Sequence, residues 1–568
     1  MGDIMTDELK SASEHDDMPK DEKAKPKRSD PRWTPNKERK VKSKKSFDQK
    51  KMAMLVDDNK SVYRGELDPR QKDPDRKPRS ISRSEELVMR KAEKLAENDP
   101  SLKDRNVVRI TDFRDQFERN DASPGRLAAL YATNQVRRRG AFAQEVIEST
   151  IDRSTISAQD RAFATLLTLG VVSTSGALDD VINRCLASPR DIKHDVRDAI
   201  RISTYEIIYL RKAPHAALDQ GVELVRAVAP SASGLANAVL HRVLAAADSF
   251  PFGDPTTSIE ALALTYAFPV WLARTLIEDM GSAAAIELMK SSNEQAPLYI
   301  HVNSLQATDD EVISLFSEVG TELEPASAGD VQVPGCFRVP NPRALNDGRI
   351  RRLFQQGKIL VSDAAAQAVA SLVTESGLPG SLLEVGAGRG TKTIMMQSIA
   401  ARKYGDQITL TSMDSHAFKS DLLRNRARDY GIDIERIVTG NATRLDSVIP
   451  GEMFDEVFID APCSGVGTLR RHHEIRWRLT PERIDELAET GLSLLKSAAS
   501  HVNPGGCIVY ATCTVMYAEN NGVVKKFLES EEGSQFALAP LNGKACFSSR
   551  QSSDSPDAHF AAKFVRKS

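Results

Sequence analysis

Apolar residues recur along this chain at two different spacings, and the change from one to the other divides it into regions. Over residues 123–250 the spacing is helical: Leu218, Val222 and Val225 fall on one face of a helix. Ser157, with an acidic residue three positions later, is typical of a helix start. These patterns predict an all-α bundle over residues 123–250.

The spacing becomes mixed over residues 254–375, where short alternating runs follow helical ones, and we predict a small α+β segment there. Over residues 376–568 short apolar runs alternate with helical patterns, which is typical of a doubly wound α/β sheet. The strands predicted in this last region are residues 382–385, 408–414, 454–460 and 507–513.

Residues 1–122 contain few large apolar side chains and many charged ones, so we predict a disordered tail. Within it, residues 20–51 hold fourteen Lys and Arg against five Asp and Glu. Such a stretch suits contact with phosphates, or it is a solvated tail that binds nothing tightly. The whole chain has a net charge of -2 and a mean hydropathy of -0.36.

Composition removes several classes of protein. No apolar run approaches the ~18 residues that a membrane span needs, and residues 1–20 are acidic and polar, unlike a secretory signal. The six cysteines include no Cys-x-x-Cys pair, so neither a disulfide scaffold nor a structural zinc site is expected. We predict a cytoplasmic protein with no membrane span and no metal.

The last region opens with a glycine-rich turn. Residues 382–393 read LLEVGAGRGTKT, a strand that runs into Gly386, Gly388 and Gly390 and then into a helix. Glycines let the backbone approach a ligand closely, and a helix N-terminus offers free N–H groups. Asp414, at the end of the next predicted strand, suits a pair of ribose hydroxyls. The pattern predicts a site for S-adenosylmethionine or a dinucleotide.

Two further strands end in chemically reactive residues. Residues 457–471 read VFIDAPCSGVGTLRR, which puts Asp460 at a strand end and Cys463 just after it. Residues 508–521 read IVYATCTVMYAENN, which puts Cys513 at the end of another strand. In a parallel sheet such ends share one crevice, so we expect two thiols and a carboxylate to converge beside the cofactor loop.

Part of the helical region resembles a known domain. The segments DRAFATLLTLGVV, AIRISTYEIIYLRKAPHAALDQGVELVRAV and LANAVLHRVL are similar to the NusB-type RNA-binding domain. The resemblance implies RNA contact through basic residues, for which Arg126, Arg137, Arg138 and Arg139 are candidates. A bundle used only for packing is the alternative.

The cysteine motifs carry a closer resemblance. The stretches Asp-Ala-Pro-Cys-Ser-Gly at 460–465 and Thr-Cys-Thr at 512–514, with Glu519-Asn520 after them, resemble the signature of the RNA cytosine-5 methyltransferases of the RsmB/NOP family. With the NusB-like domain in front, the arrangement is similar to the RsmB (Sun/Fmu) type. The resemblance implies a Rossmann-like class I methyltransferase domain, S-adenosylmethionine as cofactor and a cytosine of small-subunit (16S) ribosomal RNA as substrate. A monomer is the expected state.

The resemblance also implies roles for individual residues. Cys513 would attack carbon 6 of the cytosine, Asp460 would hold the base edge, and Cys463 would help remove the carbon-5 proton or release the product. Lys392 would lower a thiolate pKa or hold the cofactor or RNA, with a solvated lysine as the alternative. The expected cofactor-binding residues are Gly386, Ala387, Gly388, Arg389, Gly390, Thr391, Lys392, Asp414, Asn441 and Asp460.

The chain departs from the family pattern in five places, two of which are His301 in place of an arginine and Ser362 in place of a glutamine. The usual Cys-Ala-Ala-Pro-Gly-Gly-Lys-Thr loop is Gly-Ala-Gly-Arg-Gly-Thr-Lys-Thr at residues 386–393, which keeps a glycine-rich turn and the Lys-Thr pair. Asn441 stands where an acidic residue near the adenine is expected. The terminal Asp-Gly-Phe-Phe pattern becomes Asp-Ala-His-Phe at residues 557–560. These changes affect the expected RNA site more than the expected reaction.

Two other functions stay open from the sequence. One is a catalytically inactive NusB-like RNA-binding or antitermination factor, although an inert core has no need for both Cys463 and Cys513. The other is a DNA cytosine-5 methyltransferase that uses Cys463 as its nucleophile. The Thr-Cys motif and the NusB-like domain disfavour this second alternative.

Overall fold

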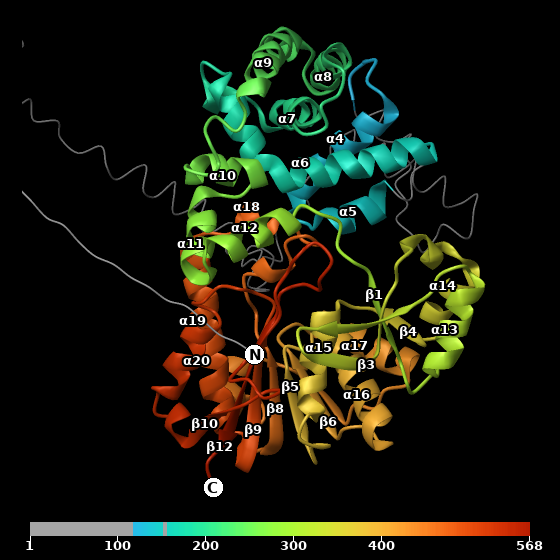
Figure 1. Ribbon diagram of the computed structural model, residues 1–568, viewed down its shortest axis with the longest axis vertical. Coiled ribbons are helices and arrows are strands. Elements are labelled where there is room, and N and C mark those ends of the chain that lie inside the picture. The colour runs from blue at the N-terminus through green and yellow to red at the C-terminus, as the bar shows by residue number, and fades with distance from the viewer. Residues whose placement is uncertain (1–116, 152–155) are drawn as a thin grey trace, which may run out of the picture. The chain divides into compact units, whose positions relative to one another are not determined.

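The structure is a computed structural model that describes residues 117–151 and 156–568 (Figure 1). These residues belong to one compact unit, residues 81–568, in which three regions follow one another along the chain. The predicted disordered tail, with its basic stretch 20–51, lies outside the described residues except for residues 117–122.

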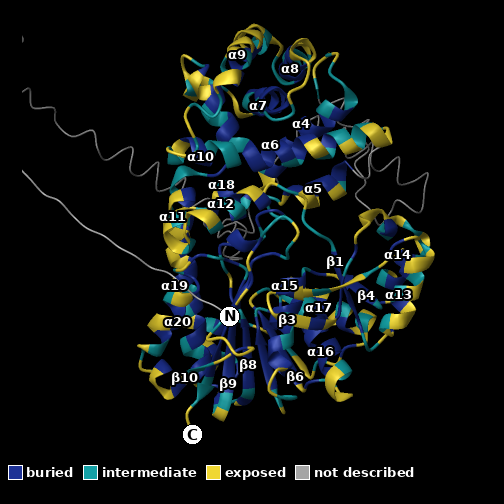
Figure 2. Ribbon diagram, in the orientation of Figure 1, coloured by how far each residue is buried: buried dark blue, intermediate teal, exposed yellow. Residues whose placement is uncertain are grey.

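The first region is an all-α bundle, as predicted. The side chain of Ser157 accepts a hydrogen bond from the backbone N–H of Asp160 at 3.0 Å, so the expected helix start is confirmed. Apolar faces such as that of Leu167 and Val171 form one buried core, in which α7 is dark blue in Figure 2. The helices are α4 (Pro124–Arg139), α5 (Ala143–Thr150), α6 (Ala158–Arg184), α7 (His194–Ile208), α8 (Pro214–Val228) and α9 (Ser233–Ala246).

Among the described residues, α6 is the one helix that is long and apolar enough to cross a membrane, judged by length and composition alone. Half of the qualifying stretch is buried inside the structure. Burial of that kind is what the central helix of a bundle shows, because neighbouring helices cover its apolar side.

The second region is the small α+β segment. Three helices come first, and a four-stranded antiparallel sheet in the order β2-β3-β1-β4 follows them. Its elements are α10 (Ile259–Tyr266), α11 (Val270–Met280), α12 (Ser282–Ser291), β1 (Tyr299–Val302), α13 (Asp309–Glu318), β2 (Glu324–Ala328), β3 (Val331–Arg338), α14 (Gly348–Gln355), β4 (Ile359–Val361) and α15 (Ala364–Ser371).

The third region is an α/β sheet in the order β10-β12-β9-β8-β5-β6-β7, with β11 paired to β12. Strands β5 to β9 run parallel, whereas β10 and β12 run antiparallel at one side. The strands are β5 (Leu382–Val385), β6 (Leu410–Asp414), β7 (Arg436–Thr439), β8 (Phe454–Asp460), β9 (Val502–Thr512), β10 (Phe536–Ala539), β11 (Phe547–Ser548) and β12 (Phe560–Arg566). The helices are α16 (Thr391–Tyr404), α17 (Ala417–Tyr430), α18 (Ile475–Arg478), α19 (Pro481–Ala499) and α20 (Asn521–Leu528).

Both faces of this sheet are covered by helices, which confirms the Rossmann-like class (Figure 1). Leu382 packs into the core cluster on the side of α15 and α16, and Leu383 into the cluster on the side of α19 and α20. Successive strand residues point to opposite faces, so a strand covered on both sides reads as a continuous apolar run. This explains why the sequence showed short apolar runs without alternation.

The structure corrects three details of the predicted strands. Strand β6 begins at Leu410, because the backbone N–H of Ile408 is taken by the Gln397 side chain at 2.7 Å. Strand β9 begins at Val502, five residues earlier than predicted, because Val502 already pairs with Phe454 of β8. The register between the two strands then shifts before the predicted part of β9 begins. The antiparallel strands after residue 513 were not predicted, since pairing between distant segments defines them: β12 pairs with β9, and β10 and β11 pair with β12.

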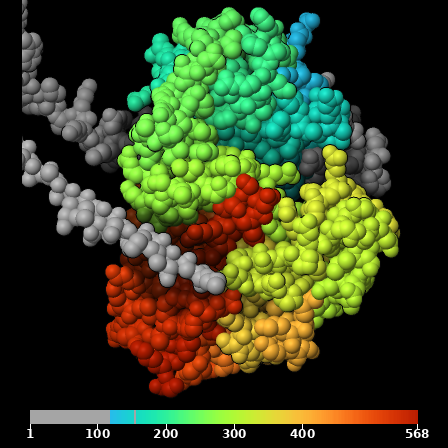
Figure 3. Space-filling view, viewed as in Figure 1, coloured from blue at the N-terminus to red at the C-terminus, as the bar shows by residue number. Residues whose placement is uncertain are grey.

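The C-terminal residues also contact the small α+β segment. Lys544 forms an ion pair with Asp330, and Arg338 Nη2 lies 3.4 Å from Asp554 Oδ1. Figure 3 shows the red C-terminal residues against the yellow-green residues of that segment. The segment around residues 544–554 therefore contacts the small α+β segment as well as belonging to the α/β region.

Candidate active site

The glycine loop lies where β5 ends and α16 begins. Gly386, Gly388 and Gly390 have φ of 85°, 59° and 78°, a backbone region that favours glycine. A Cβ atom on Gly386 would lie 2.5 Å from the carbonyl oxygen of Asp460. The loop therefore approaches the end of β8 more closely than any side chain would allow.

Asp414, at the end of β6, holds the other side of this loop. Its buried carboxylate accepts the backbone N–H of Gly388 at 3.0 Å and that of His416 at 2.9 Å. Lys419 Nζ lies 3.4 Å from the same carboxylate. The predicted ribose acid and the predicted loop are therefore in contact.

Lys392 and Asp460 form an ion pair beside the loop. Lys392 Nζ lies 2.7 Å from Asp460 Oδ2, and the two side chains are 15% and 29% exposed. Burial is the largest single influence and would lower the Lys392 pKa, but the charge of Asp460, its hydrogen bond and the two cysteines together outweigh burial, so the net pKa is raised. The charges of Cys513 and Cys463 act in the same direction, so the lysine is a stable cation near both sulfur atoms.

The two cysteines at the ends of β8 and β9 are in direct contact. Their Sγ atoms lie 3.1 Å apart, and the backbone N–H of Cys513 donates to Cys463 Sγ at 3.2 Å. The pKa of Cys463 is raised well above its usual value, first by this contact and then by burial. The Cys463 thiol therefore keeps its proton. We call Lys392, Asp460, Cys463 and Cys513 the strand-end site.

Glu519 holds the two cysteine loops together. Its carboxylate accepts the backbone N–H of Ser464 at 2.6 Å and the Ser464 hydroxyl at 2.5 Å. The Ser464 hydroxyl also lies 2.8 Å from the Thr514 hydroxyl. Each loop therefore contributes a residue next to its cysteine. Sequence reasoning gave Glu519 no role, although it stood in the quoted motif.

Glu384 is a second residue that sequence reasoning missed. It is buried in β5, and its carboxylate accepts the Thr393 hydroxyl of α16 at 2.8 Å and the Ser412 hydroxyl of β6 at 2.7 Å. Burial raises the pKa of Glu384 to about 7, despite these two hydrogen bonds. An acidic residue in an otherwise apolar strand was the only signal that would have found it.

Three other predicted cofactor residues have their side chains engaged elsewhere. Arg389 is exposed and pairs with Glu145 of α5 at 3.0 Å. The Thr391 hydroxyl accepts from Arg426 at 3.2 Å. Asn441 caps the turn that follows β7, where its side chain accepts the backbone N–H of the second residue on at 3.0 Å. The loop residue Ala387 is buried.

The arginines proposed for RNA contact in the bundle differ in their partners. Arg126 pairs with buried Glu206, and Arg137 with buried Asp198. Arg138 pairs with Asp195. Arg139 is exposed, and none of the ion pairs between described residues includes it. Among residues 117–151 and 156–568, no cluster of three or more His, Cys, Asp or Glu side chains is arranged to hold a metal ion.

Comparison with known proteins identifies the family. Residues 378–565 match the 16S rRNA methyltransferases RsmB/F, residues 123–245 the NusB family, and residues 268–342 the ferredoxin-like domain of RsmF/B-like methyltransferases. A putative methyltransferase of Mycobacterium tuberculosis is 32% identical over 442 residues, which are 74% of this chain and 90% of that protein. This chain belongs to the RsmB/F family of ribosomal RNA methyltransferases.

Two more relatives agree with this, and one solved structure shares the fold. The probable ribosomal RNA small subunit methyltransferase B of Synechocystis is 30% identical over 72% of this chain and 89% of its own length. Ribosomal RNA small subunit methyltransferase B of Escherichia coli is 27% identical over 78% and 98%. The crystal structure of PH0851 has the same fold, with a TM-score of 0.61 at 22% identity, over 78% of this chain and all of that one.

S-adenosylmethionine is the cofactor of this RsmB/F-family methyltransferase, and its residues fit that molecule. The backbone of the glycine loop is open to close approach, and the first N–H groups of α16 have no partner within the helix. The carboxylate of Asp414 stands at the end of the strand beside the loop. Ribose hydroxyls and a charged amino-acid group need donors and acceptors of this kind.

Proposed function

We propose that this protein methylates carbon 5 of a cytosine in small-subunit (16S) ribosomal RNA, through a covalent bond between Cys513 and the pyrimidine. The observation that carries the proposal is the pair of sulfur atoms 3.1 Å apart, beside Lys392 and Asp460. An isolated buried cysteine is usually inert, but two in contact next to a cation and a cofactor loop suit covalent catalysis.

Two thiols suit this reaction because carbon 5 of cytosine is a poor nucleophile. A thiolate that adds to carbon 6 makes carbon 5 electron-rich. S-adenosylmethionine, when bound, supplies an activated methyl group for that carbon. Loss of the carbon-5 proton to a base then lets the carbon–sulfur bond break, which restores the ring double bond and the thiolate.

We assign the addition to Cys513 and the release to Cys463. The raised pKa of Cys463, caused first by the Cys513 contact and then by burial, keeps a proton on its thiol. That S–H group hydrogen-bonds the neighbouring sulfur, both before the addition and when the bond breaks. Cys463 assists release in this way; to take the carbon-5 proton instead, it would first have to give up the proton of its own thiol. The Lys392 cation favours negative charge on either sulfur.

Asp460 is proposed to hold the edge of the target base. Its carboxylate is partly exposed and keeps acceptor capacity beyond the single bond from Lys392. The exocyclic amino group of cytosine can donate a hydrogen bond to this carboxylate. Lys392 fixes the direction of the carboxylate, and the charge that grows on the ring lies near both groups.

The cofactor is proposed to lie along the glycine loop. Asp414 accepts its ribose hydroxyls, and the backbone of Gly386, Gly388 and Gly390 follows its amino-acid end. Asn441 begins the turn after β7, and we place the adenine of the cofactor near this turn. The remaining residues proposed to contribute through the loop backbone are Ala387, Arg389, Thr391 and Lys392.

We propose the cytoplasm as the place of action and a monomer without a metal as the working form. The names of the Synechocystis and Escherichia coli relatives support the small subunit as the source of the RNA. Suitable phosphate contacts are the exposed basic side of α14, with Arg351 and Arg352, and Arg139, which has no ion-pair partner among the described residues.

A methyl-transfer assay tests the proposal. The protein is incubated with labelled S-adenosylmethionine and either small-subunit ribosomal RNA or duplex DNA. We expect transfer to RNA, loss of transfer by a factor on the order of 10³ or more in Cys513→Ala, and a trapped RNA adduct in Cys463→Ala. The buried core cysteine Cys507 provides the control, since Cys507→Ala removes a thiol away from the site.

The other outcomes separate the alternatives. Transfer that survives in Cys513→Ala overturns the assignment of the nucleophile. Transfer to DNA that depends on Cys463 indicates the DNA cytosine-5 enzyme. RNA binding without any transfer indicates an inactive RNA-binding or antitermination factor. Mapping of the product by base-resolution sequencing checks that the modified base is 5-methylcytosine and names its position.

A further inference from the structure

His559 is a buried histidine that none of the steps above uses. It lies in the loop before β12 and is 6% exposed, and its Nδ1 atom is buried with no hydrogen-bond partner among the described residues. Buried polar atoms are almost always paired, so this one needs an explanation. His301 shows the ordinary case: Gln367 and Ser398 lie 2.9 and 3.0 Å from its two ring nitrogens.

The pairing of β12 with β9 brings His559 next to Cys513. Phe560 is paired with Thr512 in antiparallel register, and this is the last pair of the ladder. His559 and Cys513 are the next residues on the two chains, so continuing the register brings them opposite each other. Residues opposite each other in such a pair turn to the same face. The backbone N–H of Gly467 donates to the Cys513 carbonyl at 3.1 Å, and its own carbonyl accepts the N–H of the residue before His559 at 3.0 Å.

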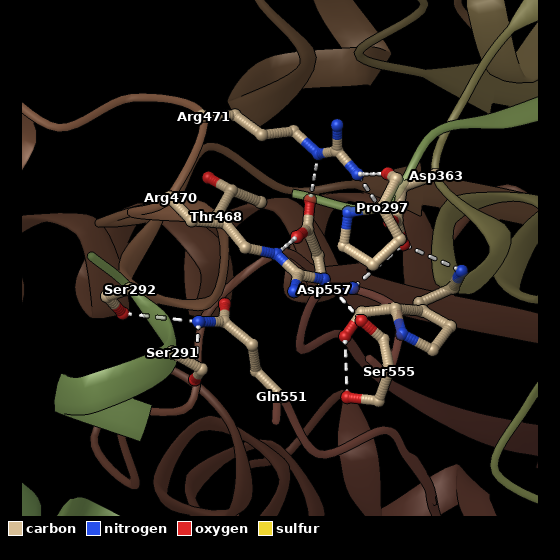
Figure 4. A network of polar contacts seen from close by, with 12 residues as sticks. Ser291, Ser292, Pro297, Asp363, Thr468, Arg470, Arg471, Gln551, Ser555 and Asp557 are labelled. Carbon is tan, nitrogen blue, oxygen red and sulfur yellow. Dashed lines mark hydrogen bonds and ion pairs between the residues drawn. The ribbon is translucent and has the colours of Figure 1, made fainter. Parts of the chain in front are cut away.

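The chain leading to His559 is fixed in place by a buried ion network, drawn in Figure 4. The Asp557 carboxylate forms ion pairs with Arg470 and Arg471, whose Nε atoms each lie 2.6 Å from one of its oxygens. The backbone N–H of Asp557 donates to Asp363 at 3.1 Å. Because two separate segments hold Asp557, the histidine two residues later is held beside the strand-end site.

Burial first, and the nearby cations after it, keep the ring neutral. Burial, and after it the Lys392 cation, lower the His559 pKa to about 4, although the carboxylates of Asp557 and Asp460 act in the opposite direction. Arg471 also lowers this pKa. A neutral imidazole carries one donor and one acceptor, in contrast to the two donors of the charged form.

We propose that His559 hydrogen-bonds the target pyrimidine with its neutral imidazole. This rests on the proposed function, since a pyrimidine attacked by Cys513 must lie against that sulfur, on the face that His559 shares. One donor and one acceptor match the mixed edge of cytosine. The family pattern that residues 557–560 resemble has a phenylalanine at this position, and its apolar ring offers no such hydrogen bond.

A binding cycle tests the contact. The ligand is a short fragment of small-subunit RNA centred on the methylated cytosine, either intact or with an abasic site at that nucleotide. Binding is measured with S-adenosylhomocysteine in place of the cofactor. We expect loss of the base to weaken binding to the wild type about 10-fold more than binding to His559→Phe. Equal weakening in both proteins overturns the proposal.

Two further variants separate contact from folding. His559→Asn keeps a polar group near the position of Nδ1 and is expected to restore part of the base dependence. His501, buried at the other end of the sheet just before β9, provides the control. His501→Phe should lower the unfolding temperature and keep the full base dependence. If the wild type transfers methyl groups normally but loss of the base weakens binding equally in the wild type and His559→Phe, only the role of His559 is rejected. If the wild type transfers no methyl group, the proposed function is rejected.

Discussion

The helical bundle and the strand-end site both bury charged groups, but they pair them differently. In the bundle, the fully buried Asp198 forms ion pairs with Arg137 Nε and Arg201 Nη1, each at 2.7 Å. Arg201 forms a second ion pair with Asp179. At the strand-end site, Lys392 has one carboxylate partner, and the two cysteine sulfurs contact each other.

This difference separates stability from chemistry. A charge pair that is closed on all sides has no capacity left for a ligand, and removal of one member leaves an uncompensated charge. An incompletely paired group retains donors and acceptors for a substrate. His559, with an unpartnered ring nitrogen, belongs to the second kind, and Arg126 and Arg137 belong to the first.

The largest effect on stability is expected from the closed network. Asp198→Asn removes a charge between Arg137 and Arg201 and should lower the free energy of unfolding by about 3 kcal/mol. The rate of methyl transfer at saturating RNA should not change. Chemical denaturation measures the first quantity and a single-turnover assay the second.

The matched control is Asp195→Asn. Asp195 also contacts Arg137, but its side chain is 38% exposed, so its loss should change the unfolding free energy by less than about 1 kcal/mol. Equal losses for the two variants would contradict the distinction between buried and open pairs.

Next in size is the effect of Glu384. Its pKa rises on folding to about 7, so the folded protein holds a proton that the unfolded chain has lost. This contribution to stability is present below about pH 4.5 and is lost as pH rises to about 7. Glu384→Gln removes it, so the unfolding free energy of the variant relative to wild type should rise by about 3 kcal/mol between pH 4.5 and pH 8.

Exposed Glu486 provides the comparison for this pH series. Its side chain is 66% exposed, so Glu486→Gln removes a carboxylate that stays in water and should change the unfolding free energy by less than about 1 kcal/mol. A Glu384→Gln difference that stays constant with pH would mean that the carboxyl is ionised in the folded protein throughout.

The smallest effect on stability is expected at Arg139. It is exposed and has no ion-pair partner among the described residues, so Arg139→Ala should change the unfolding free energy by less than about 0.5 kcal/mol. If the bundle contacts RNA, the slope of log affinity against log salt should fall by about 1. Filter binding at several salt concentrations measures it. An unchanged slope would favour a bundle used for packing.

Much of the fold follows from local patterns. The helix start at Ser157, the central strands β5 and β8, and the glycine loop were all predicted from short stretches, because capping, burial on two faces and positive φ each require particular residues in place. The cysteine motifs also lay within single stretches, and a parallel sheet brings their strand ends to the same edge.

Tertiary structure alone decided which polar groups are closed and which are open. Nothing near Arg137 in the sequence indicates Asp198, 61 residues away, and nothing near His559 indicates Cys513. Glu384 has its unusual pKa only because α16 and β6 bury it. Charge pairing and desolvation depend on distances between distant segments, whereas helix caps, strand runs and glycine turns depend on neighbours along the chain.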